Sequence, residues 1–407
     1  MDTITRSTLV FCFVLLFTLR VDAKQQKLLP SDGNAEDQFG YSVAIDGKTV
    51  LVGSINADVS DQTDSGAAYV YALSANGWQQ EAKLIADSPH AGDTLGGNVA
   101  LKGNVAMLGA SRSDTRATDA GAVFAFERDS ANWMQRQILT APDAKPGDAF
   151  GQSIALTTRF LVIGAPRGDA PLQDSGAAYV YRRDADGWQF QTKLVAADGA
   201  EGDLFGISVA IDHNTILVGA DLNDEKAEKA GAVYAFVYDG QRWIQQAKLM
   251  AEDGADTDIF GVRVALSGDT ALISARRDDL EGIGVDAGSA YVFERALGKW
   301  EQTQKLIAPD GVADDRFARG VALNTDIALI SAMHHDIQGK DAGAVYVYKK
   351  TPSGWRYHSK VIAKDGLAED RFGWNVGLSG NTAIVATPHR DDQGESSGAA
   401  YIVDLNR

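Results

Sequence analysis

A Phe-Gly pair, or a close variant of it, recurs seven times along this 407-residue chain. The seven copies are Phe39-Gly40, Leu95-Gly96, Phe150-Gly151, Phe205-Gly206, Phe260-Gly261, Phe317-Ala318 and Phe372-Gly373. Successive copies are separated by 56, 55, 55, 55, 57 and 55 residues. A period of this length indicates an array of equivalent supersecondary units, so the chain after its leader is expected to form one architecture.

Each repeat contains four short segments with the composition of β-strands. In the third repeat these segments are 150–155, 160–164, 176–181 and 188–194, and turn residues separate them. Four such segments predict a small antiparallel sheet, and helical three-and-four spacing of apolar residues is absent. Seven small sheets arranged radially make an all-β, seven-bladed β-propeller with four-stranded blades.

The seventh repeat stops at Arg407 without a fourth segment. A matching segment lies at the other end of the chain, where Gln25-Gln26-Lys27-Leu28-Leu29 resembles Gln245-Gln246-Ala247-Lys248-Leu249. We therefore predict that the N-terminal strand closes the last blade, which removes the exposed edges of an open sheet.

Residues 1–23 have the pattern of a signal peptide. Arg6 precedes an uncharged stretch at 7–19, and Val21-Asp22-Ala23 offers a cleavage site. An uncleaved anchor is the alternative, although 13 uncharged residues are few for a membrane span. We expect a secreted or periplasmic protein in which residues 24–407 form a single propeller, without a membrane span after cleavage and as a monomer.

The repeats are similar to a known family. Phe150-Gly151 is followed fourteen residues later by Gly164-Ala165-Pro166, and this pattern resembles the FG-GAP repeat of integrin α subunits and of many bacterial exported proteins. The resemblance covers all seven repeats, from Phe39 to the C-terminus. It implies a scaffold for adhesion and recognition, usually without catalysis.

Calcium-binding members of that family carry an Asp-x-Asp-x-Asp-Gly loop, which supplies several oxygen ligands from one segment. Here the corresponding segments are tight turns such as Asp46-Gly47-Lys48. The family's calcium sites are therefore not carried over, and no cofactor or metal is expected.

Two complete sets of Asp nevertheless accompany the repeats. The members lie two residues before and nineteen residues after each Phe position, namely Asp37, Asp93, Asp148, Asp203, Asp258, Asp315 and Asp370, and Asp58, Asp114, Asp169, Asp224, Asp279, Asp336 and Asp391. They are either cation ligands or acceptors that fix turns, and sevenfold repetition favours turns. Metal binding at unusual sites remains an alternative.

Departures from the repeat concentrate in its last three copies. Seventeen residues after the Phe position these copies carry Arg277, His334 and His389, with Arg319 and Trp374 on neighbouring segments. Trp374 is the one Trp outside the repeat register. Adjacent basic and aromatic groups on one face could hold a carboxylate, a sulfate or a sugar, so these five residues are the predicted ligand site. The alternative is that each basic residue balances a neighbouring Asp.

Charge and motifs narrow the class of function. The net charge of −17 disfavours binding to nucleic acid or anionic membranes. The only cysteine, Cys12, lies in the leader, and no Gly-x-Ser-x-Gly, His-Glu-x-x-His or Walker motif occurs. We predict no catalytic residues and an exported recognition or adhesion propeller that binds an extracytoplasmic protein or glycan on its loop face. A carbohydrate-binding lectin is one alternative, and a propeller hydrolase or lyase using His334, His335 and His389 is another.

Overall fold

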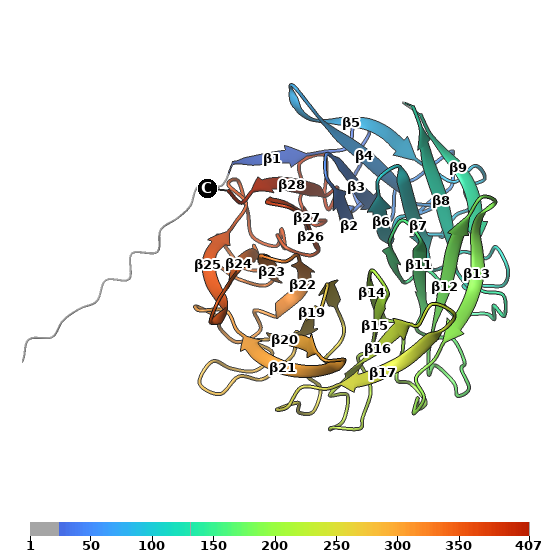
Figure 1. Cartoon of the computed structure of the whole chain (residues 1–407). Helices are drawn as coiled ribbons and strands as arrows, with labels where there is room; N and C mark the ends of the chain where they lie inside the picture. The colour runs from blue at the N-terminus through green and yellow to red at the C-terminus, as the bar shows by residue number, and fades with distance from the viewer. Residues whose placement is uncertain (1–23, 131, 407) are drawn as a thin grey trace, which may run out of the picture.

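The computed structural model describes residues 24–130 and 132–406, so the expected signal peptide lies outside the described residues. The described chain forms seven four-stranded antiparallel sheets that follow one another around a ring (Figure 1). This confirms the predicted all-β, seven-bladed propeller. The part of the chain that the structure describes contains no helix long and apolar enough to cross a bilayer.

The four strands of a blade run from the ring axis outward. The innermost strands are β2 (Phe39–Asp46), β6 (Asn98–Lys102), β10 (Ser153–Leu156), β14 (Ser208–Asp212), β18 (Val264–Ser267), β22 (Phe317–Leu323) and β26 (Val376–Ser379). The second strands are β3 (Thr49–Ser54), β7 (Val105–Ala110), β11 (Phe160–Ala165), β15 (Thr215–Ala220), β19 (Thr270–Ala275), β23 (Ile327–Ala332) and β27 (Thr382–Thr387).

In the first six blades the two outer strands are together longer than the two inner strands. The third strands are β4 (Ala67–Ser74), β8 (Ala122–Asp129), β12 (Ala177–Asp184), β16 (Ala232–Tyr238), β20 (Ser289–Ala296), β24 (Ala344–Thr351) and β28 (Ala399–Asp404). The outermost strands are β5 (Gly77–Leu84), β9 (Asn132–Leu139), β13 (Gly187–Leu194), β17 (Trp243–Leu249), β21 (Lys299–Leu306), β25 (Gly354–Val361) and β1 (Gln25–Leu28).

Neighbouring blades are joined by a backbone contact. The N–H of Phe205, for example, donates to the carbonyl of Ser175 in the preceding blade over 3.0 Å. Gly176, the residue after Ser175, has φ +85°, and a Cβ there would lie 2.1 Å from the carbonyl oxygen of Phe205. The Phe205 ring is fully buried and packs edge-on against Tyr234 at 5.4 Å between ring centroids. Each Phe position therefore fixes both the junction and the core of its blade.

The N-terminal strand closes the ring. β1 pairs antiparallel with β28 and so becomes the outermost strand of the seventh blade (Figure 1). Lys27 faces Tyr401 across this pair, as Lys248 faces Tyr234 in the fourth blade. The sequence match was therefore one residue out of register, because it aligned Lys27 with Ala247. A slip of one residue would turn the lysine to the opposite face of the sheet.

A repeated Tyr–Asp–Lys network explains that register. In six blades a Lys of the outermost strand pairs with an Asp in the loop that enters the blade, and its ammonium lies over the ring of a third-strand Tyr. In the third blade, Lys193 is 2.7 Å from Asp143, and the Tyr179 hydroxyl donates to the same carboxylate over 2.7 Å. Burial opposes ionisation of Asp143, but these hydrogen bonds outweigh it and lower its pKa. Lys27 supplies the same contact to Asp365 in the seventh blade.

We expect deletion of residues 24–29 from the processed protein to destabilise the whole ring. The deletion removes the outer partner strand of β28 and the ammonium beside Asp365, so a sheet edge is left unpaired and one ion pair is lost. The melting temperature should fall by roughly 5 °C or more. Adding a peptide of residues 24–30 to the deletion variant should raise its melting temperature part of the way back to that of the intact protein. An unchanged melting curve would show that the ring closes without β1.

Candidate ligand site beside the ring axis

Basic and aromatic side chains of three neighbouring blades meet where the innermost strands begin. Trp374 packs against Arg319, whose guanidinium carbon is 4.3 Å from the centroid of the Trp374 ring. On its other sides the indole meets Tyr41 at 5.7 Å and His389 at 5.4 Å between ring centroids. Tyr41, Arg319 and Trp374 all lie two residues after a Phe position, so equivalent strand starts place them around the ring axis.

Two further arginines extend this group. Arg263 lies three residues after Phe260 on the fifth blade, and Arg276 directly follows β19 of the same blade. We call Tyr41, Arg263, Arg276, Arg319 and Trp374 the axial cluster. All five side chains retain partial solvent exposure. A ligand approaching along the axis can therefore reach them.

The arginines of the axial cluster have no acidic partner in contact. Among residues 24–130 and 132–406, no carboxylate oxygen lies within 4.0 Å of a guanidinium nitrogen of Arg263, Arg276 or Arg319. The Nε atom of Arg276 is buried without a hydrogen-bond partner, and Arg263 donates only to the carbonyl of Val262 over 2.9 Å. In a chain with net charge −17, this is a local excess of positive charge.

The pKa shifts describe the same excess. Burial, and then the charges of Arg263 and Arg276, lower the pKa of Arg319. Burial and Arg263 also lower the pKa of Arg276, to about 10. A guanidinium nevertheless stays protonated at neutral pH, so these side chains carry positive charge in a largely desolvated site beside other arginines.

One acid faces the cluster from the fourth blade. Asp221 occupies the position that Arg276 has on the fifth blade, and its Oδ1 atom is buried without a hydrogen-bond partner. Burial raises the pKa of Asp221 to about 6, although the charges of Arg276 and Arg263 act in the opposite direction. Asp221 therefore gains its proton at a higher pH than an ordinary carboxyl, and its protonation increases the net positive charge of the site.

The structure brings together three of the five residues predicted from sequence. Arg319, Trp374 and His389 are neighbours, and Arg371 Nη1 lies 3.3 Å from His389 Nε2. Burial and Arg371 lower the pKa of His389.

The other two predicted residues lie on the surrounding loops. Arg277 is exposed beside Arg276, and the Nδ1 atom of His334 is 3.2 Å from the carbonyl of Asp314. Neither residue has a described contact with Trp374. Arg263 and Asp221 were not predicted, because each is one variable residue inside a regular repeat.

The two Asp sets fix turns. The Asp residues nineteen positions after each Phe position form the outer set. Every member accepts a hydrogen bond from a backbone N–H five to seven residues later in the chain, as Asp224 does from Lys229. The Asp residues two positions before each Phe position form the inner set. Six of them accept a hydrogen bond from the backbone N–H three residues earlier, as Asp203 does from Ala200 over 2.9 Å. In the part of the chain that the structure describes, no three His, Cys, Asp or Glu side chains are grouped as metal ligands.

We expect calcium removal to leave thermal stability almost unchanged, because these carboxylates already bind backbone donors. Melting curves with excess chelator and with added calcium should agree within about 1 °C, a shift that corresponds to a small part of the free energy of unfolding. A large loss of stability that calcium reverses would instead identify the Asp sets as ligands.

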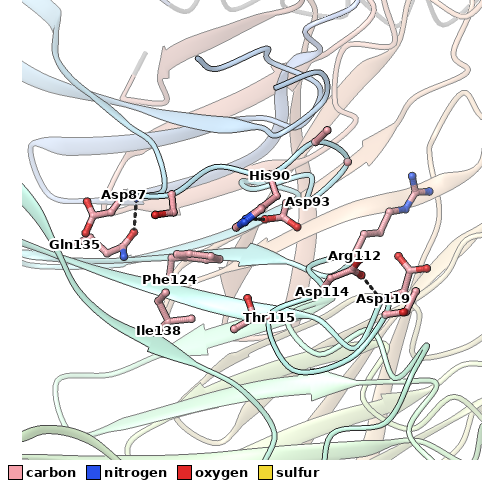
Figure 2. A pocket seen from close by; sticks show the side chains of 14 residues that line it. Asp87, His90, Asp93, Arg112, Asp114, Thr115, Asp119, Phe124, Gln135 and Ile138 are labelled. Carbon is pink, nitrogen blue, oxygen red and sulfur yellow. Dashed lines mark hydrogen bonds and ion pairs between the residues drawn. The ribbon is translucent and has the colours of Figure 1, made fainter. Parts of the chain in front are cut away.

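A pocket of about 610 Å³ lies on the second blade, where the Tyr–Asp–Lys network is missing (Figure 2). Phe124 stands at the Tyr position, Ile138 at the Lys position and Ser88 at the Asp position, so all three members of the network are replaced. Figure 2 shows Phe124 and Ile138 on one side of the pocket, with His90, Asp93 and Arg112 along the loops. The pocket therefore lies where the second blade lacks the side chains that form this network in the other six blades.

We expect the triple variant Ser88→Asp, Phe124→Tyr and Ile138→Lys to stabilise the protein by about 1 kcal/mol, because it rebuilds one buried hydrogen bond and one partly exposed ion pair. Chemical unfolding measures the change. The inverse triple variant in the third blade, Asp143→Ser, Tyr179→Phe and Lys193→Ile, should destabilise the protein by a similar amount. A destabilised repair variant would mean that the second blade has a different local backbone.

Comparison with proteins of known structure shows the same fold at low identity. A putative 6-phosphogluconolactonase from Bacteroides uniformis ATCC 8492 is 14% identical with TM-score 0.52, covering 81% of this chain and 87% of that chain. A chain of the Mitotic Checkpoint Complex is 12% identical with TM-score 0.56, covering 99% of this chain and 100% of that chain. These likenesses concern the fold alone. A comparison with curated proteins finds no match.

A family model gives the more specific result. The FG-GAP repeat model matches seven segments, at residues 23–71, 78–126, 133–181, 188–236, 243–293, 300–348 and 355–403. The matches cover all seven blades and most of the chain, in agreement with the Phe-Gly positions that join the blades. The chain therefore belongs to the FG-GAP repeat family.

Proposed function

We propose that this chain is an extracytoplasmic recognition propeller that binds a protein or a glycan at the axial cluster, without catalysis. The observation that carries the proposal is the stack of Trp374 on Arg319, 4.3 Å from ring centroid to guanidinium carbon. Both residues stand at a position that differs in every blade, two residues after the Phe position, and both remain partly exposed. Trp and Arg are the residues that most often dominate binding energy at interfaces.

The proposal includes export and a monomeric state. A signal peptide at residues 1–23 would deliver the propeller outside the cytoplasm. Closure of the ring by β1 pairs the last sheet within the chain, so folding needs no second copy. The negative net charge argues against nucleic acid as the partner.

Two alternatives to this proposal remain, a lectin and an enzyme. A lectin in the strict sense would use Trp374 and Tyr41 to stack on sugar rings. A hydrolase or lyase would need His334, His335 or His389 near a substrate, and the fold is shared with a protein named as a putative 6-phosphogluconolactonase. His335 is already engaged by Asp315 at 3.3 Å and by Lys360 at 3.0 Å, which favours a structural role for it.

We expect Trp374→Ala to weaken ligand binding by about 10-fold or more, because it removes the stacking surface and releases Arg319. A glycan array and a panel of extracytoplasmic proteins identify ligands of the wild type, and titration of each variant measures the change. Arg112→Ala on the second blade should bind normally, since Arg112 is exposed and its blade contributes no residue to the axial cluster.

Equal binding by Trp374→Ala and the wild type, with unchanged melting curves, would move the site away from the axial cluster. Release of products from a panel of polysaccharides would instead support the hydrolase or lyase alternative.

A further inference from the structure

Arg263 occupies a position that the fold uses for another purpose elsewhere. In the first, third and fourth blades the equivalent residue is Ser42, Ser153 or Ser208, and each hydroxyl donates to a carbonyl of the next blade. The acceptor is always the residue after the Phe position, as when Ser208 donates to Gly261 over 2.6 Å. This hydrogen bond therefore belongs to the junction between blades.

The fifth blade keeps that hydrogen bond but moves its donor. Ser274, on the second strand, donates to the carbonyl of Ala318 over 2.5 Å, which is the equivalent acceptor on the sixth blade. The second strands of the first, third and fourth blades have glycine at this position, such as Gly219, where a Cβ would lie 2.1 Å from the carbonyl oxygen of Gly261 and 2.4 Å from Ser208 Oγ. Because Ser274 donates this hydrogen bond in the fifth blade, the residue at position 263 is not needed as its donor.

The residue at the freed position is one that the fold does not require. Arg263 makes a single side-chain hydrogen bond, to the carbonyl of its own neighbour Val262. Its charge acts on Arg276 and Arg319, and no carboxylate oxygen of the described residues lies within 4.0 Å of any of the three guanidinium groups. Like charges gathered in a half-buried site oppose folding, so their arrangement indicates an external anion.

We infer that Arg263, Arg276 and Arg319 bind the carboxylate of an acidic sugar while Trp374 packs against the sugar ring. The inference rests on the proposed function and names its ligand class. A planar guanidinium donates two parallel hydrogen bonds to a carboxylate, and an indole offers a flat apolar surface to the ring.

The surroundings limit the number of acidic groups. The seven outer-set Asp residues, represented by Asp58, are exposed at the same end of the blades. They would repel a polyanion over about 8 Å, the Debye length at physiological ionic strength. A glycan with one acidic residue among neutral sugars therefore fits this face better than a uniformly acidic polymer.

Acidic pH should strengthen binding. Asp221 faces Arg276 and Arg263, and burial raises its pKa to about 6. Its protonation below that pH removes the carboxylate charge that acts on Arg276 and Arg263. His389 adds positive charge only at lower pH, because burial and Arg371 lower its pKa. We expect tighter binding at pH 5 than at pH 7.5, and Asp221→Asn should remove most of the difference.

The test compares two oligosaccharides by calorimetric titration, one ending in glucuronate and one of equal length ending in glucose. The wild type should bind the glucuronate compound at least about 10-fold more tightly, as expected for a charge-assisted hydrogen bond. Arg263→Ser installs the residue of the first, third and fourth blades and should lose this preference. Arg319→Gln installs the residue of the third blade, Gln152, and should do the same.

Arg167→Gln is the matched control, since it removes one exposed positive charge from the third blade and should retain the preference. Melting curves establish that each variant is folded. Equal binding of the two oligosaccharides by the wild type, no binding of either at millimolar concentration, or an unchanged preference in Arg263→Ser overturns the inference. Binding of an acidic peptide through the same arginines, in place of the sugar, also overturns it.

The proposed function is tested by a different experiment, which measures how Trp374→Ala changes the binding of any ligand found by screening. Loss of binding in Trp374→Ala together with full binding in Arg263→Ser would retain the recognition site and reject the acidic ligand.

Discussion

The ring depends on one backbone hydrogen bond that is repeated at all seven junctions between blades. The N–H of each Phe position donates to a carbonyl of the preceding blade over 2.8 to 3.0 Å. A glycine follows each acceptor with positive φ, because a side chain there would collide with the incoming backbone. Since the junction uses backbone atoms and a glycine, it leaves most side chains of the strand starts free to vary.

That freedom explains where the blades differ. The second blade replaces Phe by Leu95 and lacks the Tyr–Asp–Lys network, yet its junction hydrogen bond is kept at 2.9 Å. The fifth blade moves a junction hydroxyl from the inner strand to Ser274 and gains Arg263. The scaffold thus tolerates local departures, and recognition is expected where a departure contributes nothing to the fold.

The period of the sequence predicted the fold because every repeat carries the same alternation, turns and Phe-Gly pair. The closing strand was predicted from five residues, but its register was not, since the match ignored the contact of Lys27 with Asp365 and Tyr401. The turn-fixing role of the Asp sets was also predicted correctly, because a feature present in every blade serves the fold.

The candidate site was predicted only in part. Trp374 and Arg319 were recognised because they break the repeat, whereas Arg263 was missed because its significance lies in the exchange with Ser274 across two strands. Such an exchange becomes visible only when hydrogen-bond donors are followed from blade to blade. Arg277 shares its repeat position with His334 and His389, and the structure places it on an exposed loop beside Arg276.

Selenate, a heavy analogue of sulfate, offers the most direct measurement of the axial cluster as an anion site. A crystal of the processed protein soaked in millimolar selenate should show one strong anomalous peak within hydrogen-bond distance of Arg263 and Arg319. The same experiment on Arg263→Ser should lose that peak. Peaks confined to exposed surface arginines such as Arg167, with none at the axial cluster, would contradict the account.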